Sequence, residues 1–164
     1  MNAVAYYGSP IGLIKLEAVE GKLTAFRFAE VLEDDANCED YFAPMIKWLQ
    51  LYFKGEETQL PLPLEPIGTA FQQEVWNHVI AIPHGRTHSY EDIAIAMGDR
   101  KKIRAVAGAI GKNPLPIVIP CHRVIGKNGH LTGYLGGLWR KQYLLELEQL
   151  NTQPPLIPLV HLPI

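Results

Sequence analysis

The feature that most constrains the fold is a change of sequence pattern on the two sides of a proline-rich stretch. Residues 54–68 hold three prolines, and this composition is typical of an interdomain linker. Before it, residues 3–29 alternate like strands, with turn sequences at 8–10 and 20–22, which predicts a small β-meander. After it the patterns predict mostly helices. A length of 164 residues is enough for two small domains that share an interface.

Two short segments of the second half predict a helix-turn-helix. Ser89 precedes residues 90–97 as an N-cap, with Asp92 three residues later and Gly98 as a stop. Residues 100–111 form the next helix, which Asn113 and Pro114 end. Two short helices joined by a tight turn that contains glycine have the layout of this motif.

Three further helices are expected. The first lies in residues 36–53, the second runs from an N-cap at Thr69 through Ile80, and the third is the amphipathic segment 138–150. The proline-rich tail 151–164 is expected to wrap the surface or to be partly disordered.

Charge and composition limit the class of protein. Residues 1–68 hold 5 basic against 11 acidic residues, whereas residues 69–164 hold 10 against 6, so only the second half has the sign that suits phosphate. Neither a membrane span nor a signal peptide is expected. The two cysteines, Cys38 and Cys121, show no spacing of a disulfide framework or zinc site, so a reducing, cytoplasmic location is expected.

The best candidate for chemistry is the segment PIVIPCHRVIG at residues 116–126. An apolar run leads to Pro120, and Cys121 and His122 follow. A thiol must lose its proton before it attacks, and an imidazole oriented by a third group can accept that proton. Adjacent side chains of an extended segment point to opposite faces, so a buried cysteine beside an unrelated histidine remains an alternative. The pair alone leaves both interpretations open.

Several motifs extend this segment in both directions along the chain. They are IPCHRV (119–124), FQQEVW (71–76), IPHGRTHSYEDIA (82–94), RAVAGAIGKNPLPIVIP (104–120), GYLGGL (133–138) and KQYLLELE (141–148). Their order and spacing resemble the O6-alkylguanine-DNA alkyltransferases over about residues 69–150. SPIGLIKLEA and GKLTAFRF resemble the N-terminal domain of that family more loosely.

The resemblance implies an α/β protein of two domains. Residues 1–68 would form a small β-sheet plus helix domain of the ribonuclease H-like type, including the proline-rich linker. Residues 69–164 would form a mainly helical domain with a winged helix-turn-helix that binds DNA and carries out catalysis.

The resemblance also implies a reaction. The alkyl group of O6-alkylguanine in duplex DNA, and of O4-alkylthymine, would pass irreversibly to Cys121, once per molecule. His122 would be the base, acting through water, and Glu148 would orient it, with Glu146 as a nearby competitor for that role. Tyr90 would help to rotate the nucleotide and donate a proton toward guanine N3. No cofactor and no metal are implied.

Arg104 resembles a finger that fills the gap left by a flipped base. Small residues such as Ala105 and Gly108 would let their helix enter the minor groove, although close packing against another helix is the default reason for such residues. Asn113 would tie this helix to the active-site turn. The remaining expected DNA contacts are Ser89, Arg100, Lys101, Lys102, Lys112 and Arg123.

The substrate pocket implied by the resemblance is formed by Tyr90, Pro116, Val124, Tyr134, Leu135 and Gly136. Val124 would recognise the guanine amino group through its carbonyl. Leu135 stands where some relatives have serine, which bears on substrate range more than on the chemistry. The implied partner is double-stranded DNA that contains O6-alkylguanine, bound by a monomer; cooperative binding on DNA stays open, and no membrane is involved.

Other protein classes explain less of the sequence. Alkyltransferase-like proteins that bind the lesion without repair typically lack the cysteine that is present here as Cys121. A thiol hydrolase would not explain RAVAGAIGKNP, and a winged-helix transcription factor would not explain the candidate triad. His78, His84 and His88 do not predict a metal site, because Pro83 and Gly85 interrupt any shared helical face.

Overall fold

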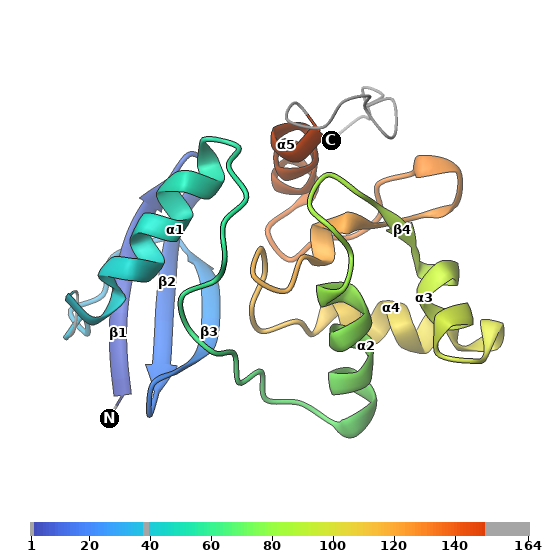
Figure 1. Cartoon of the computed structure of the whole chain (residues 1–164), viewed down its shortest axis with the longest axis horizontal. Helices are drawn as coiled ribbons and strands as arrows, with labels where there is room; N and C mark the ends of the chain where they lie inside the picture. Colours follow the sequence, from blue (N-terminus) through green and yellow to red (C-terminus); the bar gives the residue numbers. More distant parts are fainter. Residues whose placement is uncertain (1, 38–39, 150–164) are drawn as a thin grey trace. The chain divides into compact units, whose positions relative to one another are not determined.

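The computed structural model describes residues 2–37 and 40–149. Cys38, the end of the predicted last helix at Leu150 and the proline-rich tail lie outside the described residues. The chain divides into two compact units, Met1–Ile67 and Gly68–Ile164 (Figure 1). No helix within the described ranges is long and apolar enough to cross a membrane.

The first unit is built on the predicted β-meander. Strands β1 (Asn2–Ser9), β2 (Gly12–Val19) and β3 (Lys22–Ala29) pair antiparallel in the order β1-β2-β3. Alternate positions such as Ala5, Ile14 and Leu16 are fully buried, as expected for one face of a sheet packed on a core. Helix α1 (Ala43–Phe53) covers this sheet (Figure 1). It contributes Met45 and Leu49 to the core.

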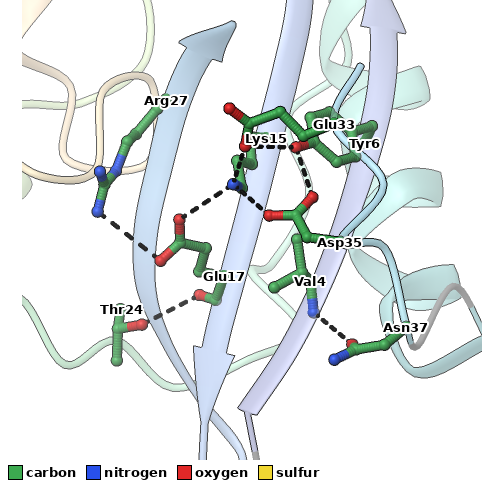
Figure 2. A network of polar contacts seen from close by, with 9 residues as sticks. All are labelled: Val4, Tyr6, Lys15, Glu17, Thr24, Arg27, Glu33, Asp35 and Asn37. Carbon is green, nitrogen blue, oxygen red and sulfur yellow. Dashed lines mark hydrogen bonds and ion pairs between the residues drawn. The ribbon is translucent and has the colours of Figure 1, made fainter.

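The opposite face of the sheet is polar. Lys15 of β2 forms ion pairs of 3.0 Å with Glu33 and 2.5 Å with Asp35, and the Tyr6 hydroxyl donates to Asp35 at 2.7 Å (Figure 2). Asn37 bonds to both the N–H and the carbonyl of Val4. The segment 33–37, which follows β3, therefore crosses the polar face of the sheet. Its Asn37 then covers the outer edge of β1 at Val4.

Part of the predicted linker also pairs with the edge of the sheet in the first unit. Leu23 of β3 donates its N–H to the Pro63 carbonyl and accepts from the Glu65 N–H, both at 2.9 Å, so Leu64 bridges to the edge of the sheet. The predicted helix 36–53 starts later than expected: a 3-10 turn η1 (Asp40–Phe42) precedes α1. Pro44 lies in the first turn of α1, where its missing N–H costs no hydrogen bond.

The second unit contains the predicted helices. Helix α2 (Ala70–Ile80) has a capping box between Thr69 and Gln72, and α3 (Tyr90–Ala96) has one between Ser89 and Asp92. Both helices begin where the capping residues predict. Gly98 ends the α3 region with φ of +93°, a conformation that favours glycine.

The segment predicted as one helix at 100–111 consists of two elements. The 3-10 turn η2 (Arg100–Lys102) is capped by Asp99, which accepts from the Lys101 N–H at 2.9 Å, and α4 (Ile103–Gly111) follows. The buried Trp76 indole of α2 donates to the Ala109 carbonyl of α4 at 2.9 Å. Helices α2 and α4 therefore pack side by side (Figure 1).

The remaining elements bring distant segments together. Two-residue strands β4 (His88–Ser89) and β5 (Val124–Ile125) pair in parallel, next to the 3-10 turn η3 (Cys121–Arg123). A tight turn, η4 (Lys127–Gly129), closes with a 2.7 Å bond from the Gly126 N–H to the His130 carbonyl. Helix α5 (Leu138–Gln149) is the last described element.

Candidate active site

Cys121 lies at the wall of a cavity of about 510 Å³ in the second unit. It begins η3 directly after Pro120 and is only 4% exposed. The cavity is lined by Tyr90, Ile103, Arg104, Ala107, Ile110, Gly111, Cys121, Thr132, Gly133, Tyr134 and Leu135. The thiol thus faces a mostly apolar space that is large enough for a small molecule or a base.

His122 and Glu148 form a buried pair. His122 Nε2 lies 2.6 Å from Glu148 Oε1, and both side chains are essentially inaccessible to solvent. An ionised carboxylate can only accept hydrogen bonds, so Nε2 carries the hydrogen and Nδ1 is the basic nitrogen of the neutral ring. This arrangement orients the imidazole and leaves Nδ1 as the atom that takes up a proton.

Arg123 is held within the protein rather than at its surface. Its guanidinium donates to both Glu148 oxygens, at 2.9 to 3.2 Å, and to the Ile82 carbonyl at 2.7 Å. The expected DNA contact by Arg123 does not fit this geometry, because the donors that would meet a phosphate are used internally. Instead Arg123 fixes the carboxylate that orients His122.

Burial and charge set the protonation of this pair. Burial lowers the pKa of His122, and this outweighs the neighbouring Glu148, so the ring is neutral near pH 7. Burial by itself would raise the pKa of Glu148, but His122 and Arg123 together lower it well below the usual range. Because arginine keeps its charge, Glu148 stays ionised when His122 is neutral.

Opposing effects act on the pKa of the Cys121 thiol. Burial raises the pKa of Cys121. The Asn113 side chain and the positive charge of Lys141 act in the opposite direction, as do the backbone N–H groups of the turn. The thiolate therefore depends on these neighbours for its stability.

Asn113 connects the end of α4 to the turn before Cys121. Its amide donates to the Ile119 carbonyl at 2.9 Å and its oxygen accepts from the Leu115 N–H at 2.9 Å, in a site only 3% exposed. The two bonds bracket Ile117, which has φ of +72°, a strained conformation for a β-branched residue. Asn113 thus holds a backbone conformation that this turn would not keep by itself.

Tyr90, the first residue of α3, also lines the cavity. Its hydroxyl donates to the Thr132 carbonyl at 3.2 Å. Burial raises the pKa of Tyr90, so the phenol keeps its proton at neutral pH and remains a donor.

The exposed face of α4 consists mainly of small residues beside a single long cation. Arg104 is exposed and also lines the cavity, and Ala105 and Gly108 are exposed next to it. A Cβ built at Gly108 or Gly111 meets nothing within 4 Å. Packing inside the protein therefore does not require glycine at these positions, although glycine weakens a helix by about 1 kcal/mol.

The other expected DNA contacts are mostly exposed basic residues at the start of this motif. Lys101 and Lys102 are exposed, as is Lys112 at the end of α4, and Arg100, which is also exposed, forms a 3.0 Å ion pair with Glu91. The Ser89 hydroxyl is used as the cap of α3, where it accepts from the Asp92 N–H at 3.0 Å.

The cavity differs in part from the expected pocket. Tyr90, Tyr134 and Leu135 line it, but Pro116, Val124 and Gly136 are buried and do not. The sequence reasoning missed Thr132 and the apolar wall from α4, since their exposure to the cavity depends on packing. It also missed Lys141, whose signal is its position seven residues before Glu148 on the same helical face.

Two domain families match the chain. The 6-O-methylguanine DNA methyltransferase DNA binding domain matches residues 70–150, and the ribonuclease-like domain of the same methyltransferase matches residues 3–66. A methylated-DNA–protein-cysteine methyltransferase of Methanosarcina acetivorans is 43% identical over 150 residues, which cover 88% of this chain and 96% of that relative. The chain belongs to the methylated-DNA–protein-cysteine methyltransferase family. This confirms the predicted class of enzyme and its two-domain fold.

Solved structures agree with this membership. The O6-methylguanine methyltransferase of Mycobacterium tuberculosis is 40% identical, with a TM-score of 0.84, and the match covers 94% of this chain and 96% of that one. A structure of the M. tuberculosis protein in complex with DNA is 41% identical, with a TM-score of 0.80 over 89% of this chain and 92% of that one. Among the described residues, no cluster of three or more histidine, cysteine, aspartate or glutamate side chains is arranged to hold a metal ion.

Proposed function

We propose that this methyltransferase repairs O6-alkylguanine in duplex DNA by moving the alkyl group to its own Cys121 after the nucleotide is flipped into the cavity. The observation that carries the proposal is that Cys121 and Arg104 line the same cavity. A base cannot reach a buried thiol from within the duplex, so it must leave the stack. Arg104, exposed at the rim, is the side chain suited to occupy the vacated space.

The reaction consumes the thiol. His122 Nδ1 accepts the proton of Cys121, directly or through water, while Glu148 and Arg123 hold the ring. The sulfur forms a bond to the alkyl carbon as the bond from that carbon to O6 breaks, and the electron pair of that bond stays with the purine. Tyr90 donates a proton toward guanine N3, so the base leaves neutral, and the proton that His122 took from the thiol returns to the Tyr90 phenolate through solvent.

The surface beside the cavity suits the minor groove. The exposed small residues of α4 permit a close approach of the helix to DNA, and the exposed lysines of the motif can contact phosphates. Readout of the minor groove is degenerate, which suits a protein that must act in any sequence. A cavity that admits a purine also admits a pyrimidine, so O4-alkylthymine is a second substrate under this proposal.

The proposed reaction requires Cys121 as a free thiol, and this requirement limits the compartment in which the protein can act. A free thiol persists in a reducing compartment, so the proposed reaction belongs in the cytoplasm.

Mass spectrometry of the Cys121 peptide tests the proposal. Incubation with a duplex that contains O6-methylguanine should add one methyl group to Cys121 and restore guanine, with one lesion repaired per protein molecule. Cys121→Ala should still bind the duplex but repair nothing. Repaired DNA together with an unmodified Cys121 would contradict direct transfer, and binding without any transfer would indicate a recognition protein instead.

A further inference from the structure

Thr132 is a polar residue of the cavity wall to which the proposed mechanism gives no role. It lies in the loop between η4 and α5 and is exposed to solvent. Its hydroxyl Oγ1 donates to the Tyr90 hydroxyl oxygen at 3.4 Å, and the Tyr90 hydroxyl donates to the Thr132 backbone carbonyl at 3.2 Å. These two residues lie 42 positions apart in the chain and are joined by a reciprocal pair of hydrogen bonds at the cavity.

Packing fixes the direction in which the Thr132 hydroxyl points. Gly126, which precedes η4, donates its N–H to the His130 carbonyl at 2.7 Å. A Cβ built at Gly126 would lie 3.0 Å from that carbonyl oxygen and 3.4 Å from the Thr132 methyl carbon Cγ2. The Thr132 methyl group therefore lies beside Gly126. Because the methyl and hydroxyl groups of threonine share one stiff side-chain torsion, this position of the methyl group directs the hydroxyl toward Tyr90.

The Tyr90 proton must leave the Thr132 carbonyl before it can reach a base. A carbonyl oxygen has two lone pairs, and the Lys141 ammonium donates to the same carbonyl at 3.0 Å. The carbonyl therefore keeps a partner when the phenol proton turns away from it. The bond from the Thr132 hydroxyl to the Tyr90 oxygen does not use the phenol proton, so this bond can persist while that proton points into the cavity.

We propose that Thr132 is a positioning residue for the alkyl transfer, whose hydroxyl holds the Tyr90 oxygen and stabilises the phenolate left when Tyr90 gives its proton to guanine. In that step the O–H bond of Tyr90 breaks, the N3–H bond of guanine forms, and the electron pair of the O–H bond stays on the Tyr90 oxygen. Thr132 keeps its own proton and only donates a hydrogen bond. The inference rests on the proposed function, since it concerns the proton that neutralises the departing base.

The chemistry of the phenol agrees with this assignment. A hydrogen bond to a charged oxygen is stronger than one to a neutral oxygen, so Thr132 contributes most after the proton has left. Both bonds are long in the free protein, and catalytic hydrogen bonds of this kind tighten once the substrate is bound. Burial raises the pKa of Tyr90, and the hydrogen bond with Thr132 acts in the opposite direction.

Charged groups also surround the phenol of Tyr90. Cys121 of η3 and Lys141 of α5 face it, and Arg104 of α4 lines the same cavity. The Thr132 hydroxyl differs from these groups because it is neutral throughout the pH range of an assay. Its removal therefore leaves the charges around the phenol as they are.

Three substitutions at Thr132 separate its hydroxyl from its methyl group. Thr132→Val keeps the shape of the side chain but removes the donor, whereas Thr132→Ser keeps the donor and removes the methyl group. Thr132→Ala, compared with Thr132→Ser, repeats the loss of the donor without the methyl group, so the comparison does not depend on the folding of Thr132→Val. Thr58→Val is the matched control, because Thr58 is exposed in the first unit.

The first readout is the rate of transfer from free O6-benzylguanine to Cys121. Thr132→Val should be about ten-fold slower than the unaltered protein, which is the effect expected from one hydrogen bond to a charged group. Thr132→Ser and Thr58→Val should keep most of the rate. Modification of Cys121 by iodoacetamide, whose leaving group needs no proton, should be equally fast in all of these proteins. Equal transfer rates for Thr132→Val and Thr132→Ser, or equal losses on both reagents, would overturn the inference.

The second readout is the effect of Thr132→Val in a protein that already carries Tyr90→Phe. A hydroxyl that acts through the phenol oxygen has no group to act on there, so the added substitution should leave the remaining transfer rate unchanged. A hydroxyl with only a structural role would slow transfer by the same factor in both backgrounds. An undiminished loss in the Tyr90→Phe background would therefore contradict the positioning of Tyr90.

The third readout needs no substrate. Nuclear magnetic resonance of the tyrosine ring carbons as pH is varied measures the pKa of Tyr90, with Tyr90→Phe to assign its signal. Loss of a donor to the phenolate raises the pKa, so Tyr90 should titrate at higher pH in Thr132→Val than in Thr132→Ser or the unaltered protein. Overlapping titrations, with alkyl transfer by the unaltered protein, would contradict this inference alone. A shifted titration without any alkyl transfer would instead contradict the proposed function and support the contact, so the two failures are distinguishable.

Discussion

Glu148 Oε1 lies 2.6 Å from His122 Nε2, although 26 residues separate the two in the chain. Arg123, adjacent to His122, donates to the same carboxylate. The last helix therefore supplies the acid that orients the base of the active-site turn. Three ionisable side chains from two elements form one buried unit, and it is their arrangement that makes the thiol pocket a candidate for proton transfer.

Stability in acid should depend on Glu148. The pKa of this carboxyl is lower in the folded protein than in the unfolded chain, where it is near 4.5. The unfolded state therefore binds the proton first as pH falls, so the stabilisation is present above pH 4.5 and is progressively lost below it. Urea unfolding between pH 3 and 7 should show Glu148→Gln destabilised by about 3 kcal/mol at pH 7, since it leaves Arg123 buried without its partner. The gap between variant and unaltered protein should narrow toward pH 3; a constant gap would contradict this account.

Gly108→Ala should separate stability from DNA binding. Its Cβ would meet nothing within 4 Å, so the substitution should stabilise the protein by about 0.5 to 1 kcal/mol through helix propensity. The added methyl group should weaken binding to duplex DNA if α4 enters the minor groove. Gly98→Ala is the contrasting control, because φ of +93° makes alanine unfavourable there without touching α4. Unchanged DNA affinity for Gly108→Ala would argue against close approach of this helix.

Asn113→Ala should destabilise the protein by about 1 to 3 kcal/mol. The substitution leaves the buried Ile119 carbonyl and Leu115 N–H without their partner and releases the turn that holds Ile117. Thermal unfolding measures the effect. Asn77→Ala, at an exposed position of α2, is the matched control and should change stability by less than about 0.5 kcal/mol. Equal effects of the two substitutions would show that the Asn113 bonds are unimportant.

Arg104→Ala should distinguish base flipping from chemistry. A finger that replaces the extruded base is needed for duplex substrate but not for the free base, so repair of duplex O6-methylguanine should fall more than reaction with free O6-benzylguanine. Rapid-mixing assays on both substrates measure this ratio. Arg86→Ala, which removes another exposed arginine, should leave the ratio as it is. A similar loss on both substrates for Arg104→Ala would count against the finger role.

Much of the local structure was predictable because it depends on neighbours in sequence. The capping boxes at Thr69 and Ser89 specify where α2 and α3 begin, and the turn sequences of the β-meander specify its three strands. The pattern predicts one helix at 100–111, whereas the structure has η2, which Asp99 caps, followed by α4.

The candidate site was predictable only as a set of residue types. Tyr90, Tyr134 and Leu135 reach the cavity as expected, whereas Val124 and Gly136 are buried away from it. The spacing of the motif KQYLLELE, which resembles that of the family, placed Glu148 ahead of Glu146 as the partner of His122, and the 2.6 Å contact agrees with that preference. The position of a residue along a helix decides on which face its side chain lies. Which neighbour that face contacts depends on the packing of the whole unit.

The amino-acid sequence by itself determined the family, the helix starts, the meander and the adjacent cysteine and histidine, because these reside in residue identities and short spacings. Only the tertiary structure decided that Arg123 binds Glu148 rather than facing outward, and that Lys141 is buried behind the cavity wall. The physical reason is that a charged side chain takes its role from the groups that enclose it. Those groups come from α3, η3, α5 and the loops that hold Ile82 and Thr132, and they meet only when the unit is folded.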